Sequence, residues 1–455
     1  MPTDFTLVPV IDEGLGNSTY LLDLGDGRAM VLDPERDVRA VRAEAQRRNL
    51  RIAYAIETHM HADFISGVRE LADTDGATVL APEVGPRGFA VTGMSDGDTV
   101  ELGRFRLQAL FTPGHSPEHL SYLLHHGDRL LGVFTGGSLM VGTAGRTDLV
   151  SPDQTVPLAR AQYHSLQRLM ELPDDTPVWP THGAGSFCSA APDGERVSTV
   201  GRERETNPLL QVAGEDEFVA ALLGSLGTFP GYFLRLGEIN HNGPAVLGAT
   251  PALAPLTTAD VQHLIADGAQ VVDVRTAAAF AAGHIPGALS ITLRPVFATW
   301  LGWLADPTRP VVIVRDPSQN PDDIAWEAVK VGFDTLAGEL HGGMPAWTGP
   351  REDDATTLVA ADRLAIQPGA VLDVRQHGEY TAGHVPAARN IELGALTAHL
   401  DQVPEGPVVV MCGHGERAMT AASILARAGH TDIRVIDGGA ADYARATAGT
   451  LQVGS

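Results

Sequence analysis

The sequence contains very few cysteines. Only Cys188 and Cys412 occur among its 455 residues, which excludes a framework of disulfide bonds and is typical of a reducing cytosol. The first ten residues have neither a basic start nor a long apolar run, so we expect no signal peptide. No stretch approaches the ~20 consecutive apolar residues that a membrane span needs. We therefore expect a cytoplasmic protein that has no membrane partner.

Basic residues are also scarce. The chain has 32 Lys and Arg against 56 Asp and Glu, which gives a net charge of −24. Such a charge repels the phosphate backbone, so we expect no nucleic-acid partner. Fifty glycines and thirty prolines are spread along the chain, which indicates many turns rather than disorder. At this length we expect two or three domains, each with its own core.

Cys412 lies where an apolar strand at 408–411 is expected to turn into a helix at 418–428. The connecting loop reads Cys412-Gly413-His414-Gly415-Glu416-Arg417. Backbone N–H groups and the positive end of the helix favour an anion at the sulfur, and Arg417 adds a fixed positive charge. We therefore predict that Cys412 carries sulfur as a persulfide. Cys412 and Arg417 are the predicted catalytic residues, and the four residues between them, 413–416, are expected to contact the substrate.

Two stretches of the C-terminal half repeat each other. The run Val-Val-Asp-Val-Arg at 271–275 is followed by Gly-His-Ile-Pro at 283–286, and the run Val-Leu-Asp-Val-Arg at 371–375 by Gly-His-Val-Pro at 383–386. The two copies lie 100 positions apart (373 minus 273), which indicates duplicated domains. Each copy alternates short apolar strands with helical stretches, a pattern typical of a parallel sheet covered by helices.

These runs, together with the cysteine loop and a late Gly-Gly turn at 438–439, resemble rhodanese-like sulfurtransferase domains. The resemblance covers residues 257–350 and 358–450, and it implies that the Asp-x-Arg and Gly-His runs are parts of the framework. The first copy has Asp316 and Pro317 where the second has Cys412 and Gly413. A carboxylate cannot accept a sulfane sulfur, and proline lacks an N–H group. We therefore predict an inactive first copy and an active second one.

Histidines gather in the N-terminal half. His59, His61 and Asp63 follow an apolar strand at 52–56 with the spacing His-x-His-x-Asp. His115 and His182 lie in two further loops, beside glycine and proline. Histidines on loops at strand ends can converge on one metal ion, because neutral imidazole is a common metal ligand. The sequence therefore predicts a metal site in this half.

These runs, with Phe-Thr-Gly at 134–136 and Gly-Arg-Thr-Asp at 145–148, resemble the metallo-β-lactamase superfamily and, within it, the persulfide dioxygenases. The resemblance covers residues 1–247 and implies an αββα sandwich. It also implies one Fe(II) held by two histidines, here His59 and His115, and by one carboxylate. Arg146 falls in the region that shapes the glutathione side of the pocket in that family. It is a candidate for binding substrate, or it forms an ion pair with Asp148 that only fixes the loop.

Two positions depart from the family's pattern. Gly137 stands where the family has its aspartate ligand, and Phe64 stands where dinuclear hydrolases have a histidine for their second metal. Phe64 therefore argues against a hydrolase that resembles glyoxalase II, whereas Gly137 removes a ligand from either kind of enzyme.

Three outcomes remain open for this pocket. His59, His61 and His115 hold one metal ion, Fe(II) or Zn(II). Alternatively, Asp63 supplies the missing carboxylate, or the pocket is empty and this half is a scaffold. His182 is then a fourth ligand or a hydrogen-bonding group outside the ligand set.

The fold class that we expect is α/β, an αββα metallo-β-lactamase sandwich followed by two rhodanese-like domains with parallel sheets. The function that we expect is sulfur transfer through Cys412, coupled to oxidation of glutathione persulfide or another thiol persulfide to sulfite. The alternatives are a metal-dependent thioesterase or a metal-free scaffold that has only the rhodanese activity. The expected partners are small molecules, namely a persulfide, thiosulfate or glutathione, and the fold family allows a homo-oligomer.

Overall fold

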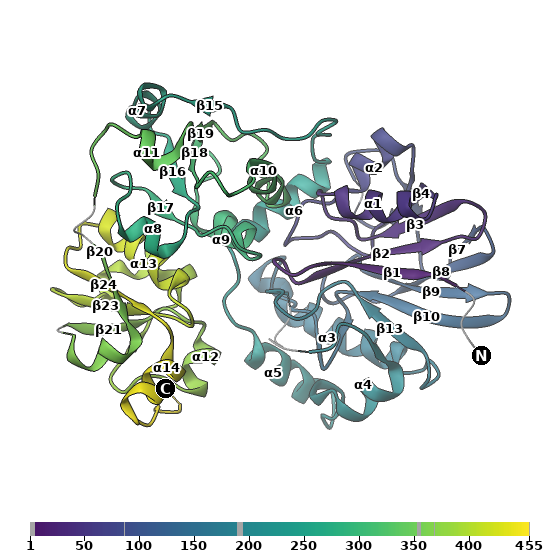
Figure 1. The fold of residues 1–455 in the computed structure, drawn as a ribbon. Helices are drawn as coiled ribbons and strands as arrows, with labels where there is room; N and C mark the ends of the chain where they lie inside the picture. Colours follow the sequence, from purple (N-terminus) through teal and green to yellow (C-terminus); the bar gives the residue numbers. More distant parts are fainter. Residues whose placement is uncertain (1–4, 86, 189–193, 353–355, 368, 455) are drawn as a thin grey trace. The chain divides into compact units, whose positions relative to one another are not determined.

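The structure is a computed structural model that describes residues 5–85, 87–188, 194–352, 356–367 and 369–454 (Figure 1). The chain forms two compact units. The first consists of residues 1–250 with 326–332, and the second of residues 251–325 with 333–455. Among the described residues, no helix combines the length and the apolar character needed to cross a membrane.

The first unit is built on two six-stranded sheets. One sheet has the order β1 (Leu7–Asp12), β2 (Asn17–Asp23), β3 (Arg28–Leu32), β4 (Arg51–Ile56), β5 (Thr78–Pro82), β6 (Thr92–Met94). The other has the order β14 (Ser198–Thr199), β13 (Pro177–Pro180), β10 (Arg129–Gly136), β9 (Leu120–His126), β8 (Phe105–Phe111), β7 (Thr99–Leu102). A small ribbon pairs β11 (Leu139–Met140) with β12 (Thr143–Ala144).

Helices cover the outer faces of both sheets, as Figure 1 shows. They are α1 (Arg39–Arg47), α2 (Val68–Asp75), α3 (Pro152–Leu169), α4 (Val200–Thr206), η1 (Pro208–Leu210), α5 (Glu215–Ser225) and α6 (Tyr232–Asn242). Strand β3 shows why four layers form, because its side chains alternate between two cores. Met30 and Leu32 pack between the sheets, whereas Ala29 and Val31 pack against α1 and α2. The predicted αββα sandwich is confirmed.

The second unit contains two five-stranded sheets in which every pair of neighbouring strands is parallel. The first has the order β15 (Pro255–Leu256), β19 (Gly338–Leu340), β18 (Val311–Val314), β16 (Gln270–Asp273), β17 (Leu289–Ser290). The second has the order β20 (Thr356–Ala360), β24 (Ile433–Asp437), β23 (Val408–Met411), β21 (Ala370–Asp373), β22 (Arg389–Asn390). The equal strand order confirms the duplication and the predicted parallel sheets.

Helices follow the strands in both repeats. The first repeat has α7 (Thr258–Ala266), α8 (Ala277–Ala281), α9 (Phe297–Leu304), α10 (Pro321–Lys330) and α11 (Gly343–Ala346). The second has η2 (Ala361–Ile366), α12 (His377–Ala382), η3 (Leu393–Gln402), α13 (Glu416–Arg427) and α14 (Ala440–Thr447).

The repeated Asp-x-Arg and Gly-His runs form the same framework in both copies. In the second copy, Arg375 Nη2 donates to Asp373 Oδ2 at 2.6 Å and to the carbonyl oxygen of Gly383 at 2.9 Å. The His384 ring stacks on Tyr380 with the ring centres 3.8 Å apart. The first copy repeats the two hydrogen bonds at the same lengths, from Arg275. The framework role predicted for these runs is confirmed.

We expect Arg375→Leu to lower the free energy of unfolding of the second repeat by about 3–5 kcal/mol, because it leaves the buried Asp373 carboxylate without its partner. Hydrogen exchange of the amides in β21 and β23, measured in the full chain, reports the change. The control is Arg445→Leu, which removes an exposed ion pair with Asp442 and should leave this protection almost unchanged. Equal effects of the two variants would contradict the framework role.

Candidate active sites

Six metal-binding side chains of the first unit meet at the carboxyl ends of its strands. Asp33 follows β3, the loop after β4 carries His59, His61 and Asp63, and His115 and His182 follow β8 and β13. All six are buried. The potential ligand atoms lie within 4.8 Å of one another in three groups, which are His59–His115–His182, Asp33–His59–His61 and His61–Asp63–His182.

Hydrogen bonds fix the proton of each imidazole in the first group. His115 Nδ1 lies 2.8 Å from the carbonyl oxygen of Arg146, which can only accept, so Nδ1 carries the proton. Asn17 Nδ2 donates to the Asp63 carboxylate at 2.9 Å, which turns the amide oxygen of Asn17 toward His182 Nδ1 at 2.8 Å. The Nε2 atoms of His115 and His182 therefore present lone pairs.

His59 follows the same rule. The Thr58 hydroxyl donates to Asp33 Oδ2 at 2.7 Å, so it accepts from His59 Nδ1 at 2.8 Å. His59 Nε2 therefore also carries a lone pair, and this atom lies 3.3 Å from His182 Nε2. Two buried lone pairs at this distance repel each other unless a cation lies between them. The cluster is therefore able to bind a metal ion.

Burial keeps the imidazoles of His59 and His115 neutral, which is the form that binds metals. Burial, followed by the charge of His182, lowers the pKa of His115 to about 3. Burial, followed by the charge of His61, lowers the pKa of His59 well below its usual value. Burial alone would raise the pKa of Asp63, but His182, His61 and a hydrogen bond from Asn17 lower it to about 2. The cluster thus combines neutral imidazoles with an ionised carboxylate.

His61 lies beside this group rather than within it. Its Nε2 is 3.1 Å from Asp33 Oδ1, and neither ring nitrogen makes a hydrogen bond of good geometry with any described residue. The sequence predicted His59, His61 and His115 as the ligands. The close groups join His59 and His115 to His182, and they join His61 to His59 with Asp33 and to His182 with Asp63. The ligand role of His61 stays a prediction. Phe64 stacks on the His61 ring, with the ring centres 4.2 Å apart.

Gly137 provides no ligand, and the space beside it is filled. A Cβ atom built at Gly137 would lie 2.1 Å from His115 Cδ2. The Gly137 N–H donates to His119 Nε2 at 3.0 Å. An aspartate at position 137 would therefore require the His115 ring to move.

The sequence analysis missed three buried residues at this site, Asp33, His119 and Cys188. Asp33 ends the apolar run of β3, which is the same signal that identified His59, but it lacks a histidine beside it. Cys188 lies near Asp63 and Arg146. Burial, followed by the charge of Asp63, raises the pKa of the Cys188 thiol well above its usual value, so the thiol is neutral.

Arg146 is held in place by several contacts. It forms two hydrogen bonds with Asp148, at 2.7 and 2.9 Å, and donates to the carbonyl oxygens of Phe187 and Gly227. Its guanidinium also lies 4.5 Å from the centre of the Phe229 ring. The ion pair that fixes the loop is present, and substrate binding by Arg146 stays a prediction.

Cys412 lies at the junction of β23 and α13, as the sequence predicts. The N–H of Gly415 donates to Cys412 Sγ at 3.1 Å, and Gly415, with a φ of +98°, is the cap of α13. Position 439 in the late Gly-Gly turn needs glycine for a steric reason. A Cβ at Gly439 would lie 2.4 Å from the carbonyl oxygen of Gly413. The sulfur is therefore placed at the positive end of a twelve-residue helix.

Arg417 is paired with a carboxylate, and its role at the sulfur stays a prediction. Its two terminal nitrogens donate to the two oxygens of Glu379, at 2.6 and 2.8 Å. The sequence of the loop predicted that Arg417 stabilises the anionic sulfur. The pairing of Arg417 with Glu379, 38 residues earlier, could not be predicted from the sequence. The charge of Arg417 is therefore largely balanced.

The corresponding loop of the first repeat is closed by its own side chains. The N–H of Asp316 donates to Gln319 Oε1 at 2.8 Å, and Gln319 Nε2 donates to the carbonyl oxygen of Val274 at 2.8 Å. Arg315 pairs with Glu339. The equivalent aspartates Asp273 and Asp373 pair with Val314 and Met411, so Arg315, rather than the predicted Asp316, follows its strand where Cys412 does. The Gln319 side chain closes this loop, whereas in the second repeat the Gly415 N–H donates to Cys412 Sγ.

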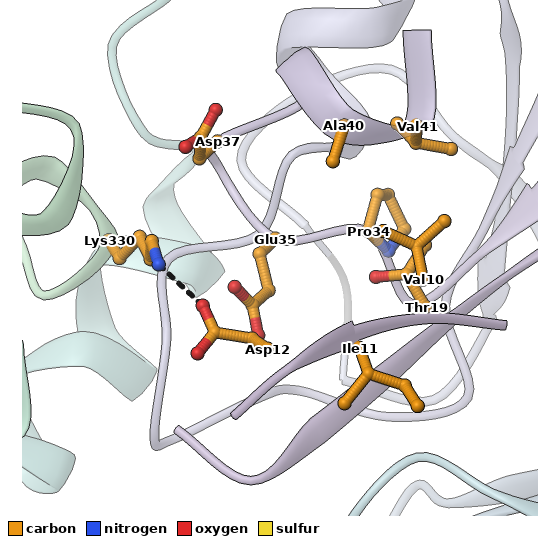
Figure 2. Close-up of a pocket in the computed structure, with 10 residues that line it drawn as sticks. All are labelled: Val10, Ile11, Asp12, Thr19, Pro34, Glu35, Asp37, Ala40, Val41 and Lys330. Atoms are coloured by element: carbon orange, nitrogen blue, oxygen red, sulfur yellow. Dashed lines mark hydrogen bonds and ion pairs between the residues drawn. The ribbon is translucent and has the colours of Figure 1, made fainter. Parts of the chain in front are cut away.

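A cavity of about 170 Å³ in the first unit is separate from both sites. Figure 2 shows Asp12, Glu35 and Lys330 gathered in its wall, with Lys330 bonded to Asp12. Lys330 also donates to Glu327 at 2.6 Å. Although burial opposes it, Asp12 and Glu327 raise the pKa of Lys330. Glu35 is a third carboxyl group beside Lys330, and burial, followed by the charge of Asp12, raises its pKa well above its usual value. The lining includes none of the predicted site residues.

Comparison with known proteins agrees with this geometry. The family model of the metallo-beta-lactamase superfamily matches residues 12–182, and the model of the rhodanese-like domain matches residues 257–350 and 357–446. The chain is 33% identical to the persulfide dioxygenase ETHE1 of Homo sapiens over 214 residues, which cover 46% of this chain and 76% of the relative. A hydroxyacylglutathione hydrolase of Ruegeria pomeroyi is 29% identical, over 50% of this chain and 94% of the relative.

A crystal structure of a metallo-beta-lactamase from Staphylococcus aureus covers 74% of this chain and 99% of its own length, with a TM-score of 0.66 and 26% identity. The chain therefore belongs to the metallo-β-lactamase superfamily, with a first domain related to the ETHE1 persulfide dioxygenase, followed by two rhodanese-like domains.

Proposed function

We propose that the chain is an enzyme of sulfur metabolism that transfers sulfur through a Cys412 persulfide and oxidises a thiol persulfide to sulfite in its first domain. The observation that carries the first half is the Gly415 N–H aimed at Cys412 Sγ from 3.1 Å, at the start of α13. An anionic sulfur is stabilised there by the helix end. The proposed partners are small molecules, namely thiosulfate, glutathione persulfide or a related thiol persulfide.

Sulfur transfer then takes two displacements. The Cys412 thiolate attacks the outer sulfur of thiosulfate, a new S–S bond forms at Sγ, and the sulfur–sulfur bond of thiosulfate breaks to release sulfite with the electron pair. A thiolate, sulfite or cyanide acceptor next attacks the outer sulfur of the persulfide, and Sγ leaves as a thiolate. The Gly415 N–H stabilises the negative charge on Sγ in both steps. His414 is exposed at the mouth of the loop, where an incoming anion would pass.

The residues of the first domain fit a metal ion. The lone pairs of His59 and His182 face each other, and Asp63 Oδ1 and both His61 ring nitrogens are buried without a hydrogen-bonding partner among the described residues. In our proposal, His59, His115 and His182 hold the ion, and Asp63 fixes His182. A bound Fe(II) would supply the O₂-dependent oxidation of a persulfide, whereas Zn(II) would supply only hydrolysis.

One observation favours a second candidate, a metal-dependent thioesterase. The group His61–Asp63–His182 could hold a second ion beside the first. Hydrolases that use two metal ions place them about 3.5–4 Å apart. Phe64, stacked on His61, occupies the position where the dinuclear pattern has a histidine, so we favour the dioxygenase.

We expect Cys412→Ser to lower thiosulfate:cyanide sulfurtransferase turnover on the order of 10³-fold or more, because serine cannot hold the transferred sulfur. The control is Asp316→Ser, which makes the same residue in the corresponding loop of the first repeat and should keep the parent rate. Parent turnover in Cys412→Ser would rule out this half of the proposal.

Oxygen uptake tests the other half. We expect the iron-loaded protein to consume O₂ with glutathione persulfide and to produce sulfite. The thioesterase alternative predicts turnover of thioesters in the absence of O₂, and the scaffold alternative predicts neither reaction. An oxygen electrode combined with a sulfite assay separates the three outcomes.

Elemental analysis tests the ligand set. We expect one metal ion per parent chain. In His115→Ala we expect the affinity for the metal ion to be at least ~10-fold lower, because a ligand is lost. The control is His164→Ala, since the His164 side chain is 69% exposed and lies outside the cluster. Equal metal content in His115→Ala and the parent would show that His115 is not a ligand.

The same measurement tests the packing around Gly137. We expect both Gly137→Ala and Gly137→Asp to hold less metal than the parent, because the added Cβ displaces the His115 ring. The alanine variant separates the steric effect from that of a carboxylate. An aspartate variant with more metal than the parent would contradict the packing argument.

A further inference from the structure

The first repeat packs closely on the second inside one compact unit. The N–H of Ser290, at the end of β17, donates to Ser423 Oγ on α13 at 3.1 Å. On the other side, Trp303 of α9 lies against Gly394, where an added Cβ would come within 2.0 Å of the indole ring. Such a contact leaves little freedom between the two repeats, so residues of the first are fixed relative to the Cys412 loop.

Arg294 follows Ser290 by four residues, and a segment of that length reaches at most roughly 13 Å. On α13, Glu416 lies seven residues before Ser423, which is roughly 10 Å of helix. A segment anchored at Ser423 can therefore reach the start of α13, where the cysteine loop lies. Burial lowers the pKa of the Arg294 guanidinium, and the charges of Glu416, Arg417 and Cys412 also act on it.

Arg294 differs from the other cations near this loop because it has no partner. Arg417 is paired with Glu379, and Arg375 with Asp373. Arg294 is half-buried, and its side chain makes neither a hydrogen bond nor an ion pair with any described residue. A guanidinium remains charged in proteins, and a partly desolvated one gains from binding an oxyanion.

We propose that Arg294 of the first repeat is the anion-binding residue of the Cys412 site and takes the oxyanion end of the sulfur donor or of the departing sulfite. This inference rests on the proposed sulfur transfer, and it names both the substrate class and the residue that recognises it. The repeat that lost its nucleophile then completes the site of the other repeat.

Paired alkylation of Cys412 tests this without requiring turnover. In both reactions the thiolate forms an S–C bond and iodide leaves, but iodoacetate is an anion and iodoacetamide is neutral. The rate of each is followed by mass spectrometry of the peptide that contains Cys412, in the full chain. We expect the iodoacetate-to-iodoacetamide rate ratio to fall about fivefold to tenfold in Arg294→Gln, because one nearby positive charge is lost.

Three variants complete the design. Arg294→Lys keeps the charge and should keep most of the ratio, and Arg294→Met keeps the aliphatic stem without the charge, in case glutamine prevents folding. Arg309→Gln removes a positive charge of the same repeat that is near Arg427, at the far end of α13, and should leave the ratio unchanged. An unchanged ratio in Arg294→Gln and Arg294→Met, or an equal fall in Arg309→Gln, would overturn the proposal.

The thiosulfate assay separates this proposal from the proposed function. We expect Arg294→Gln to raise KM for thiosulfate about tenfold with a smaller change in kcat, since Arg294 binds the anion and does not react. If the parent shows no sulfurtransferase activity but the alkylation ratio falls in Arg294→Gln, the sulfur transfer is wrong and the anion site stands. If the parent is active and the ratio does not fall, the anion site is wrong and sulfur transfer stands.

Discussion

Three imidazoles turn their Nε2 lone pairs into one small buried volume, and the polar groups around them permit no other orientation. Each Nδ1 is tied to an acceptor, which is a backbone carbonyl for His115, an amide oxygen for His182 and a threonine hydroxyl for His59. The Asn17 amide and the Thr58 hydroxyl are in turn fixed by Asp63 and Asp33. Burial lowers the pKa of His59 and of His115, so these two imidazoles are neutral, and a bound cation would relieve the repulsion of the lone pairs. The loops at the strand ends of the first domain are arranged to meet this condition.

The cysteine site is built on backbone groups rather than on imidazoles. A helix end and one N–H group face Sγ, and the adjacent cation, Arg417, is balanced by Glu379. The first repeat kept its Asp-x-Arg framework although a glutamine closed its loop. The framework and the loop are therefore independent parts of the fold, so a copy can lose its nucleophile and still fold and still pack against its partner.

Local patterns in the sequence predicted much of the architecture. The alternation of short apolar strands with helical stretches predicted the parallel sheets, and the resemblance of the histidine-rich runs to the metallo-β-lactamase superfamily implied the sandwich. The loops that follow apolar runs identified His59, His115 and Cys412, because each signal lies within a few neighbouring residues. Contacts between distant segments were beyond this reasoning. The pairing of Glu379 with Arg417 and the approach of Arg294 to the other repeat depend on tertiary packing, which no spacing in the chain encodes.

The close contact between Gly137 and the His115 ring has a consequence for how this family can change over generations. Two of the four glycine codons differ from an aspartate codon by one base, so a lineage with glycine at this position can be one mutation away from the carboxylate. The imidazole that now occupies the space makes that step unfavourable until the segment around His115 has itself shifted. Replacement of the aspartate by glycine is thus easier than the reverse change. We expect descendants of such a chain to use other ligand sets instead.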